Sequence, residues 1–177
     1  RAEYRYPGTS RDVLRGLSLT VPQGQRVAVL GRSGAGKSTL ASLVRGDIRP
    51  DAGGVTLGGS PTADLGDEAA KWIGVIQQRT YLFNMTLRDN LRIGREDATD
   101  DEVWDALGRV GLRSMAERLP NGLDTLVDEA GLRFSGGERH RVALARVLLQ
   151  DVPVVILDEP TVGLDPITER ALLDDLF

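Results

Sequence analysis

Residues 31–39 read Gly31-Arg32-Ser33-Gly34-Ala35-Gly36-Lys37-Ser38-Thr39. This stretch fits the pattern G-x-x-x-x-G-K-S/T, in which glycines let consecutive backbone N–H groups turn toward one point and hold a phosphate chain. A helix that starts near Lys37 would add the partial positive charge of its N-terminus. We expect the Lys37 ammonium to reach the terminal phosphates of a nucleotide and the Ser38 hydroxyl to ligate Mg²⁺.

The segments on either side of this stretch have the character that the pattern requires. Residues 26–30 form a short β-branched run, which predicts a buried parallel strand. Residues 37–46 carry apolar side chains at helical spacing and end near a glycine, which predicts a helix. The alternative is a flexible Gly-Ser turn, and the strand before it and the helix after it disfavour that interpretation.

A second candidate site follows the apolar run at 154–157, which predicts another buried strand. Asp158 and Glu159 come directly after this run. A carboxylate in the position of Asp158 can hold Mg²⁺ through water, and Glu159 can polarise a water that attacks the γ-phosphate. Taken alone, the segment is also compatible with a strand that ends in an ordinary acidic turn.

A third candidate site opens the helix that is predicted from residue 135 to residue 149. Its first residues are Ser135-Gly136-Gly137-Glu138. A serine followed by glycines at a helix N-terminus presents a hydroxyl and bare amides to an anion. The alternative is a plain capping role for Ser135 with a glycine loop.

The remaining pattern indicates an α/β fold with a largely parallel sheet, because strands alternate with helices. Further strands are expected at 13–21, 53–57 and 73–76, and helices across 86–119. The length of 177 residues favours one domain.

Composition limits the function classes. The net charge is −4 and no cluster of basic residues is present, which argues against nucleic-acid binding. The absence of cysteine excludes disulfides and thiolate metal sites and fits a reducing compartment. No apolar run approaches the roughly 20 residues that cross a bilayer, so this chain itself is expected to be soluble.

The order of these motifs resembles the nucleotide-binding domain of ABC transporters over nearly the whole chain. The resemblance implies a P-loop NTPase fold: an ABC ATPase domain with a mainly parallel central sheet, an N-terminal antiparallel β region and a helical subdomain at approximately 84–150. It implies one domain over 1–177 that lacks its C-terminal part. The switch histidine of the family would follow a further strand after the D-loop, whereas the only histidine here is His140, which we expect to be solvated on its helix.

The resemblance also assigns roles to single residues. Phe134 to Glu138 is similar to the family signature LSGGQ, with Phe for Leu and Glu for Gln. The implied ATP-binding residues are Tyr6, Arg32, Ser33, Gly34, Ala35, Gly36, Lys37, Ser38, Thr39, Gln78 and Asp158. The implied metal ligands are Ser38, Gln78 and Asp158, the catalytic residue is Glu159, the D-loop residue is Asp165, and the residues that contact the partner's ATP are Ser135, Gly136, Gly137 and Glu138. Tyr6 would stack on adenine and Gln78 would join Mg²⁺ to a transmembrane partner. As alternatives, Tyr6 could be a strand aromatic and Gln78 a surface amide.

The implied partners are a second ABC nucleotide-binding domain in a head-to-tail pair and a transmembrane domain in the same full-length chain. Residues 81–91 are similar to the exporter form of the family, and residues 158–165 together with Glu138 resemble the CydC subunits of bacterial CydDC exporters. Those subunits are linked with export of cysteine and glutathione, with haem, and with cytochrome bd assembly. This implies ATP-driven export at the cytoplasmic face of the bacterial inner membrane.

Three other interpretations remain. A nucleic-acid-associated ABC ATPase would normally carry a coiled coil between the phosphate loop and Ser135, where this chain has only a short helical region. An importer ATPase on a separate chain fits Pro160 but fits residues 82–90 less well. A non-catalytic binding module is disfavoured by Glu159.

Overall fold

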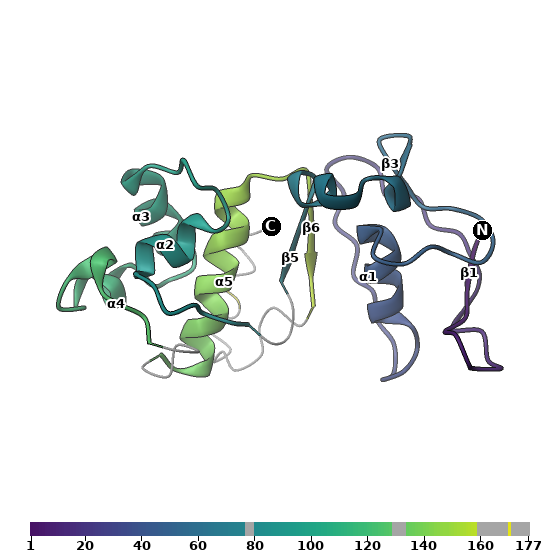
Figure 1. The fold of residues 1–177 in the computed structure, drawn as a ribbon, viewed down its shortest axis with the longest axis horizontal. Coiled ribbons are helices and arrows are strands. Elements are labelled where there is room, and N and C mark those ends of the chain that lie inside the picture. The colour runs from purple at the N-terminus through teal and green to yellow at the C-terminus, as the bar shows by residue number, and fades with distance from the viewer. Residues whose placement is uncertain (77–79, 129–133, 159–169, 171–177) are drawn as a thin grey trace. The chain divides into compact units, whose positions relative to one another are not determined.

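The computed structural model describes residues 1–76, 80–128, 134–158 and 170 (Figure 1). Three predicted site residues, Gln78, Glu159 and Asp165, lie outside the described residues. The elements in chain order are β1 (Ala2–Tyr4), β2 (Leu14–Leu17), α1 (Lys37–Arg45), β3 (Thr56–Leu57), β4 (Ser60–Pro61), η1 (Thr62–Asp64), η2 (Gly66–Lys71), β5 (Ile73–Ile76), α2 (Leu87–Arg92), α3 (Asp100–Arg109), α4 (Arg113–Glu117), η3 (Gly122–Asp124), α5 (Gly136–Gln150) and β6 (Val154–Leu157), where η marks 3₁₀ helices. The chain divides into two compact units, Arg1–Ile73 and Gly74–Phe177.

The first unit holds two antiparallel strand pairs and one α-helix. β1 pairs with β2, and β3 pairs with β4. Helix α1 begins at Lys37 as predicted and ends before Gly46, whose positive φ of 80° terminates the helix in the left-handed conformation. The small core of this unit joins Tyr4, Leu14 and Leu43, so α1 packs on the β1–β2 pair through its buried face.

The predicted strand at 26–30 is wrong as a description of this structure. These residues are not in a strand, and Leu30 is 91% exposed. A parallel strand needs a hydrogen-bonded neighbour and cover on both faces. Among the described residues, the three sheets each contain two strands and none includes this segment.

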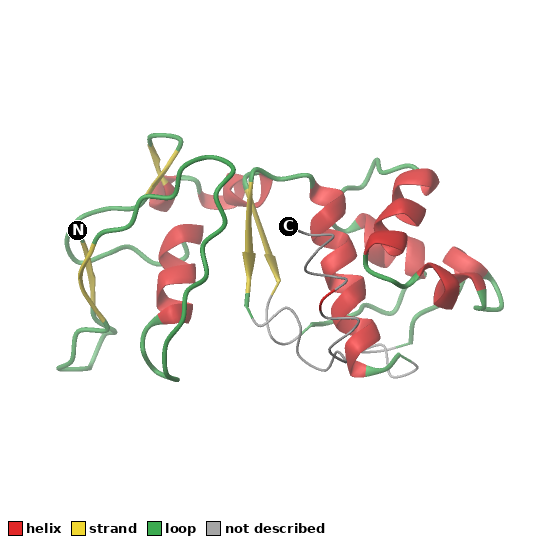
Figure 2. Ribbon diagram, turned by 180° about the vertical axis from the view of Figure 1, so that it is seen from behind, coloured by secondary structure: helices red, strands yellow, loops and turns green. Residues whose placement is uncertain are grey.

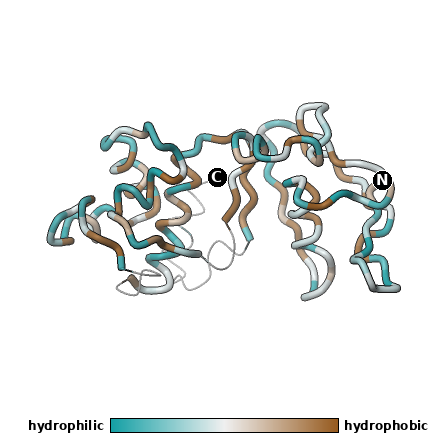
Figure 3. Tube along the Cα trace, viewed as in Figure 1, coloured by the Kyte–Doolittle hydropathy of each residue, from teal (hydrophilic) through white to brown (hydrophobic). Residues whose placement is uncertain are grey.

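The second unit is built around α5, which contacts both α2 and α3. Strands β5 and β6 form the third pair, and in Figure 2 their arrows point the same way, so this pair is parallel. Figure 3 shows hydrophobic residues along both strands. The strand at 154–157 is confirmed but its complete burial is not, because the described pair has no third strand and Val155 is 46% exposed.

A large hydrophobic core holds the second unit together. Its members are the apolar side chains of β5, the three helices α2, α3 and α5, and the loops between them, including Leu82, Leu87, Leu91, Val103, Leu107, Val142, Leu144 and Leu149. The described elements thus mix helices with one parallel and two antiparallel strand pairs. Among the described residues, no helix combines the length and apolar composition that a bilayer-crossing segment requires.

Candidate nucleotide-binding site

Lys37 lies folded over the loop that precedes α1. Its Nζ donates hydrogen bonds to the carbonyl oxygens of Gly31 at 2.8 Å and Arg32 at 3.2 Å. The loop turns back on itself because Ala35 N–H donates to Arg32 O at 3.1 Å and because Gly34 and Gly36 adopt positive φ values of 76° and 97°. The Lys37 ammonium therefore lies against the backbone carbonyl oxygens of this turn.

The N-terminus of α1 has no side-chain cap. The longer helices of the second unit differ, because Thr99 caps α3 and Ser135 caps α5. The first intrahelical bond of α1 is donated by Leu40 to Gly36 O, so the amides of the first turn point toward the loop. This end of α1 suits a polyphosphate, because it combines backbone amides without a partner in the helix, the positive end of the helix dipole and an ammonium. The Ser38 hydroxyl in the same turn supplies an oxygen of the kind that Mg²⁺ prefers.

Tyr6 lies beside this helix. Its hydroxyl is 3.0 Å from Thr39 Oγ1, and its ring meets Tyr4 edge to face at 5.0 Å between centroids. Tyr6 is 42% exposed, so part of its side chain is accessible to a ligand. The structure thus brings Tyr6 to the phosphate loop, although the two are 33 residues apart in the chain.

The residues at the start of α5 form a reciprocal capping box. Ser135 Oγ accepts from Glu138 N–H at 3.2 Å, and the Glu138 carboxylate accepts from Ser135 N–H at 2.8 Å. The Ser135 hydroxyl also bonds to the Glu138 carboxylate, so its O–H is engaged within the capping box in this structure. Partial burial works to raise the pKa of Glu138, but the hydrogen bonds from Ser135 and the nearby Arg141 and Arg118 outweigh it, and the pKa lies below its ordinary value.

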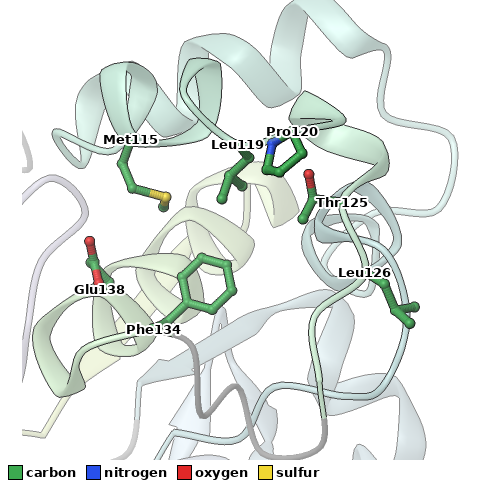
Figure 4. A pocket seen from close by; sticks show the side chains of 7 residues that line it. All are labelled: Met115, Leu119, Pro120, Thr125, Leu126, Phe134 and Glu138. Atoms are coloured by element: carbon green, nitrogen blue, oxygen red, sulfur yellow. The ribbon is translucent and has the colours of Figure 1, made fainter.

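Phe134 anchors this helix start in the core. Its side chain is 5% exposed and belongs to the large cluster of the second unit. It also lines a pocket of about 210 Å³ with Met115, Leu119, Pro120, Thr125, Leu126 and Glu138. Figure 4 shows the Phe134 ring and the Glu138 carboxylate on the same side of this pocket, with Met115 and Leu119 facing them. A phenylalanine in place of the family's leucine is therefore accommodated by apolar surroundings.

Asp158 directly follows β6, as predicted. Its N–H donates to Ile76 O at 3.0 Å, which continues the β5–β6 ladder by one residue. The carboxylate is thus placed at the carboxyl end of a parallel strand, where ligand-binding groups of α/β proteins gather.

The prediction for His140 is wrong. Its side chain is 4% exposed, not solvated. His140 shares one helix face with Leu144 and Val147, four and three residues apart in succession, and that face packs into the core.

The sequence reasoning missed one buried polar residue and its partly buried partner. Asn90 has no exposed surface, and it bonds to Arg146 of α5. A signal was available, because Asn90 stands between Leu87 and Leu91 at core-facing spacing, where an apolar residue is expected.

Comparisons with known proteins identify the family. A protein-family model described as ABC transporter matches residues 14–162. The chain is 51% identical over 168 residues to the "Glutathione/L-cysteine transport system ATP-binding/permease protein CydD" of Bacillus subtilis, covering 95% of this chain and 29% of that protein. It is 43% identical over 173 residues to the corresponding CydC protein of Escherichia coli, covering 97% of this chain and 30% of that protein.

A solved structure agrees with these relatives. It is described as "Structure of a bacterial Atm1-family ABC exporter with ATP bound", with a TM-score of 0.91 and 38% identity, and the match covers 99% of this chain and 31% of that one. The chain therefore spans less than a third of the proteins it matches. The expected likeness to CydDC-type exporter subunits and the P-loop NTPase fold are confirmed. The chain belongs to the ABC transporter family and is its ATP-binding ATPase domain.

Proposed function

We propose that this domain binds Mg²⁺-ATP on residues 31–39 and hydrolyses it to power export across a membrane. The observation that carries the proposal is the geometry of the loop before α1. Lys37 Nζ is held over Gly31 and Arg32, and the uncapped helix N-terminus faces the same loop. A bound triphosphate would replace these internal carbonyl contacts of Lys37 with charge-assisted bonds.

The loop and the acidic strand end divide the chemistry between them. The amides of residues 32–39 and Lys37 bind the phosphates, and the exposed part of the Tyr6 ring stacks on adenine. Ser38, Gln78 and Asp158 are the proposed metal ligands, and Mg²⁺ when bound neutralises charge on the β- and γ-phosphates. Glu159 follows Asp158 and holds the attacking water as its acceptor.

A second ABC domain completes the site in this proposal. The Ser135 hydroxyl lies at the N-terminus of α5, where it would exchange its bond to Glu138 for one to a phosphate, and the amides of Gly136 and Gly137 follow it. These groups form an anion site that would contact the γ-phosphate on the partner domain, with Asp165 at the same junction. A head-to-tail pair uses both phosphate-binding ends of each chain.

The transmembrane partner is proposed to bind near Tyr81 and Phe83. Their rings meet edge to face at 5.0 Å, and they are 50% and 42% exposed. Two neighbouring exposed aromatics favour a protein contact. The names of the CydD and CydC relatives support glutathione or L-cysteine as cargo, a transmembrane domain in the same full-length chain, and a place at the cytoplasmic face of the bacterial inner membrane. The net charge of −4 is unfavourable for binding to nucleic acid, so we do not propose nucleic acid as a partner.

The test compares the two lysines of the chain. Lys37→Ala is expected to weaken ATP binding about a hundredfold, because a charged donor to phosphate is lost. The matched control is Lys71→Ala, since Lys71 lies on the surface and pairs with Glu68 at 2.6 Å. Isothermal titration calorimetry with ATP and Mg²⁺ measures both.

Turnover is tested in the same preparation. Glu159→Gln should bind ATP like the unchanged protein and release no phosphate above background. Equal ATP affinity of the Lys37 and Lys71 variants, or normal phosphate release by Glu159→Gln, would contradict the proposal. Cargo is tested by uptake of labelled glutathione into inverted membrane vesicles, with Glu159→Gln as the inactive reference.

A further inference from the structure

Arg146 lies midway along α5, and its guanidinium donates hydrogen bonds to neighbouring backbone and amide oxygens. Its Nε donates to Asn90 O at 2.6 Å, one Nη donates to Asn90 Oδ1 at 2.6 Å, and the other donates to Tyr81 O at 2.7 Å. The guanidinium carbon also lies 5.7 Å from the centroid of the Phe83 ring. One side chain of the signature helix thus holds three points of the segment 81–90.

Asn90 organises the same segment from inside. Its Oδ1 accepts from Phe83 N–H at 2.9 Å, and its Nδ2 donates to Phe83 O at 2.9 Å and to Thr86 O at 3.0 Å. The Asn90 side-chain amide therefore holds the turn at 83–86 together, and both its oxygen and its nitrogen form hydrogen bonds. Because Arg146 bonds to the same Oδ1, the turn and the helix share one buried joint.

The joint is close-packed as well as hydrogen-bonded. A Cβ added at Gly94 would collide with the carbonyl oxygen of Arg146, so the chain after α2 runs directly against the α5 backbone. Burial lowers the pKa of Arg146 to about 10, which shows that the charge is held at a cost. A partly buried cation with three hydrogen bonds is better evidence for a fixed geometry than for stability.

We propose that Arg146 is a positioning residue, which with Asn90 fixes residues 81–90 to α5 so that both move as one body. Ser135 caps the same helix eleven residues earlier, about 16 Å along its axis. The joint would therefore transmit a displacement at Ser135, where the partner's ATP is proposed to bind, to the exposed Tyr81 and Phe83. The inference rests on the proposed function, because it assigns a role in turnover.

The test replaces the planar fork of Arg146 by an ammonium. Arg146→Lys keeps the charge but cannot reach three oxygens in different directions. The matched control is Arg113→Lys on α4, whose arginine is exposed and pairs with Glu117 at 3.2 Å. Both are made in the protein expressed from its complete coding sequence and placed in lipid vesicles.

Two readouts separate positioning from plain stability. Steady-state ATPase kinetics, corrected for folded fraction, are expected to show kcat about tenfold lower for Arg146→Lys, with KM for ATP within twofold of the unchanged protein. Hydrogen exchange is expected to accelerate in residues 81–90 and to stay unchanged in α3. Arg113→Lys should match the unchanged protein in both.

Other outcomes overturn the inference. If Arg146→Lys behaves like Arg113→Lys, or if kcat falls only in proportion to the folded fraction, the joint has no positioning role. If Arg146→Lys does not fold, Asn90→Asp takes its place, because it keeps the acceptor for Arg146 and removes the donors to Phe83 and Thr86, and the same criteria apply. Loss of the proposed function itself shows differently, as an absence of Lys37-dependent hydrolysis in the unchanged protein.

Discussion

Gly36 is the residue on which loop and helix both depend. Its φ of 97° lies in the region that side chains with a Cβ rarely adopt. A Cβ there would also stand 3.0 Å from Val13 Cγ1 and 3.1 Å from Leu14 Cδ2, in the β1–β2 region. The glycine thus lets the phosphate loop turn into α1 while the loop packs on the first core.

Gly36→Ala is therefore expected to lower the free energy of unfolding by about 1–3 kcal/mol, because it combines left-handed strain with a close contact. ATP affinity should fall at least tenfold, since the amides of the first turn move. Gly34→Ala is the control, because its φ of 76° is equally strained but its Cβ would meet nothing within 4 Å. Chemical denaturation and calorimetry measure the two effects. An alanine at position 36 that costs no more than one at position 34 would refute the packing argument.

At the scale of elements, the two longest helices of the second unit, α3 and α5, close their N-termini with side-chain caps, whereas α1 does not. Helix α3 closes its N-terminus with a complete capping box between Thr99 and Glu102. Arg95 also forms an ion pair with Glu102, so one carboxylate serves the helix end and the loop before it. The pKa of Glu102 is lowered from 4.5 to about 2, mainly by the hydrogen bond from Arg95 and next by the hydrogen bonds from Thr99.

This shift predicts a pH dependence. A carboxyl whose folded pKa is lowered stabilises the fold fully above its unfolded pKa, near 4.5, and loses that contribution as pH falls toward 2. Glu102→Gln keeps a capping amide but no charge. The unchanged protein should have the higher Tm at pH 6, and the difference should shrink steadily below pH 4.5. Circular dichroism melts across this range measure it, and a difference that is constant with pH would contradict the assignment.

At the scale of the whole molecule, the two units have unequal cores. The buried apolar cluster of Arg1–Ile73 contains Tyr4, Leu14 and Leu43, whereas that of Gly74–Phe177 extends through α2, α3 and α5. Burial of apolar area is the main favourable term in folding. The nucleotide loop therefore belongs to the unit that contributes less of the described core.

Hydrogen exchange should be faster in the unit with the smaller core, and nucleotide binding should reduce that difference. Without ATP, amides of α1 are expected to exchange faster than those of α3 and α5, because local opening costs less where few apolar contacts must break. ATP with Mg²⁺ should slow exchange in residues 31–45, since a ligand stabilises the state that binds it. The Lys37→Ala variant should lose this protection and Lys71→Ala should keep it. Equal protection of α1 and α5 without ATP would argue against the unequal cores.

Much of the fold and the phosphate loop could be predicted from the sequence, because these features depend on neighbours in the chain. Helix α1 begins at Lys37 and Ser135 caps α5, as spacing and capping residues indicate. The β-branched run at 26–30 follows the same local rule but is not a strand here, since a strand exists only with a partner. Asp158 was placed correctly because it directly follows its strand.

The amino-acid sequence by itself determined the helix starts, the glycine turns and the family, since each rests on a few consecutive residues. Only the tertiary structure decided that Tyr6 meets Thr39, that His140 is buried and that Asn90 shares its amide oxygen with Arg146. These facts depend on which surfaces meet across many residues of chain. Burial and long-range hydrogen bonds arise where those surfaces pack together, so a local pattern can mark a core-facing position such as Asn90 but does not specify its partner.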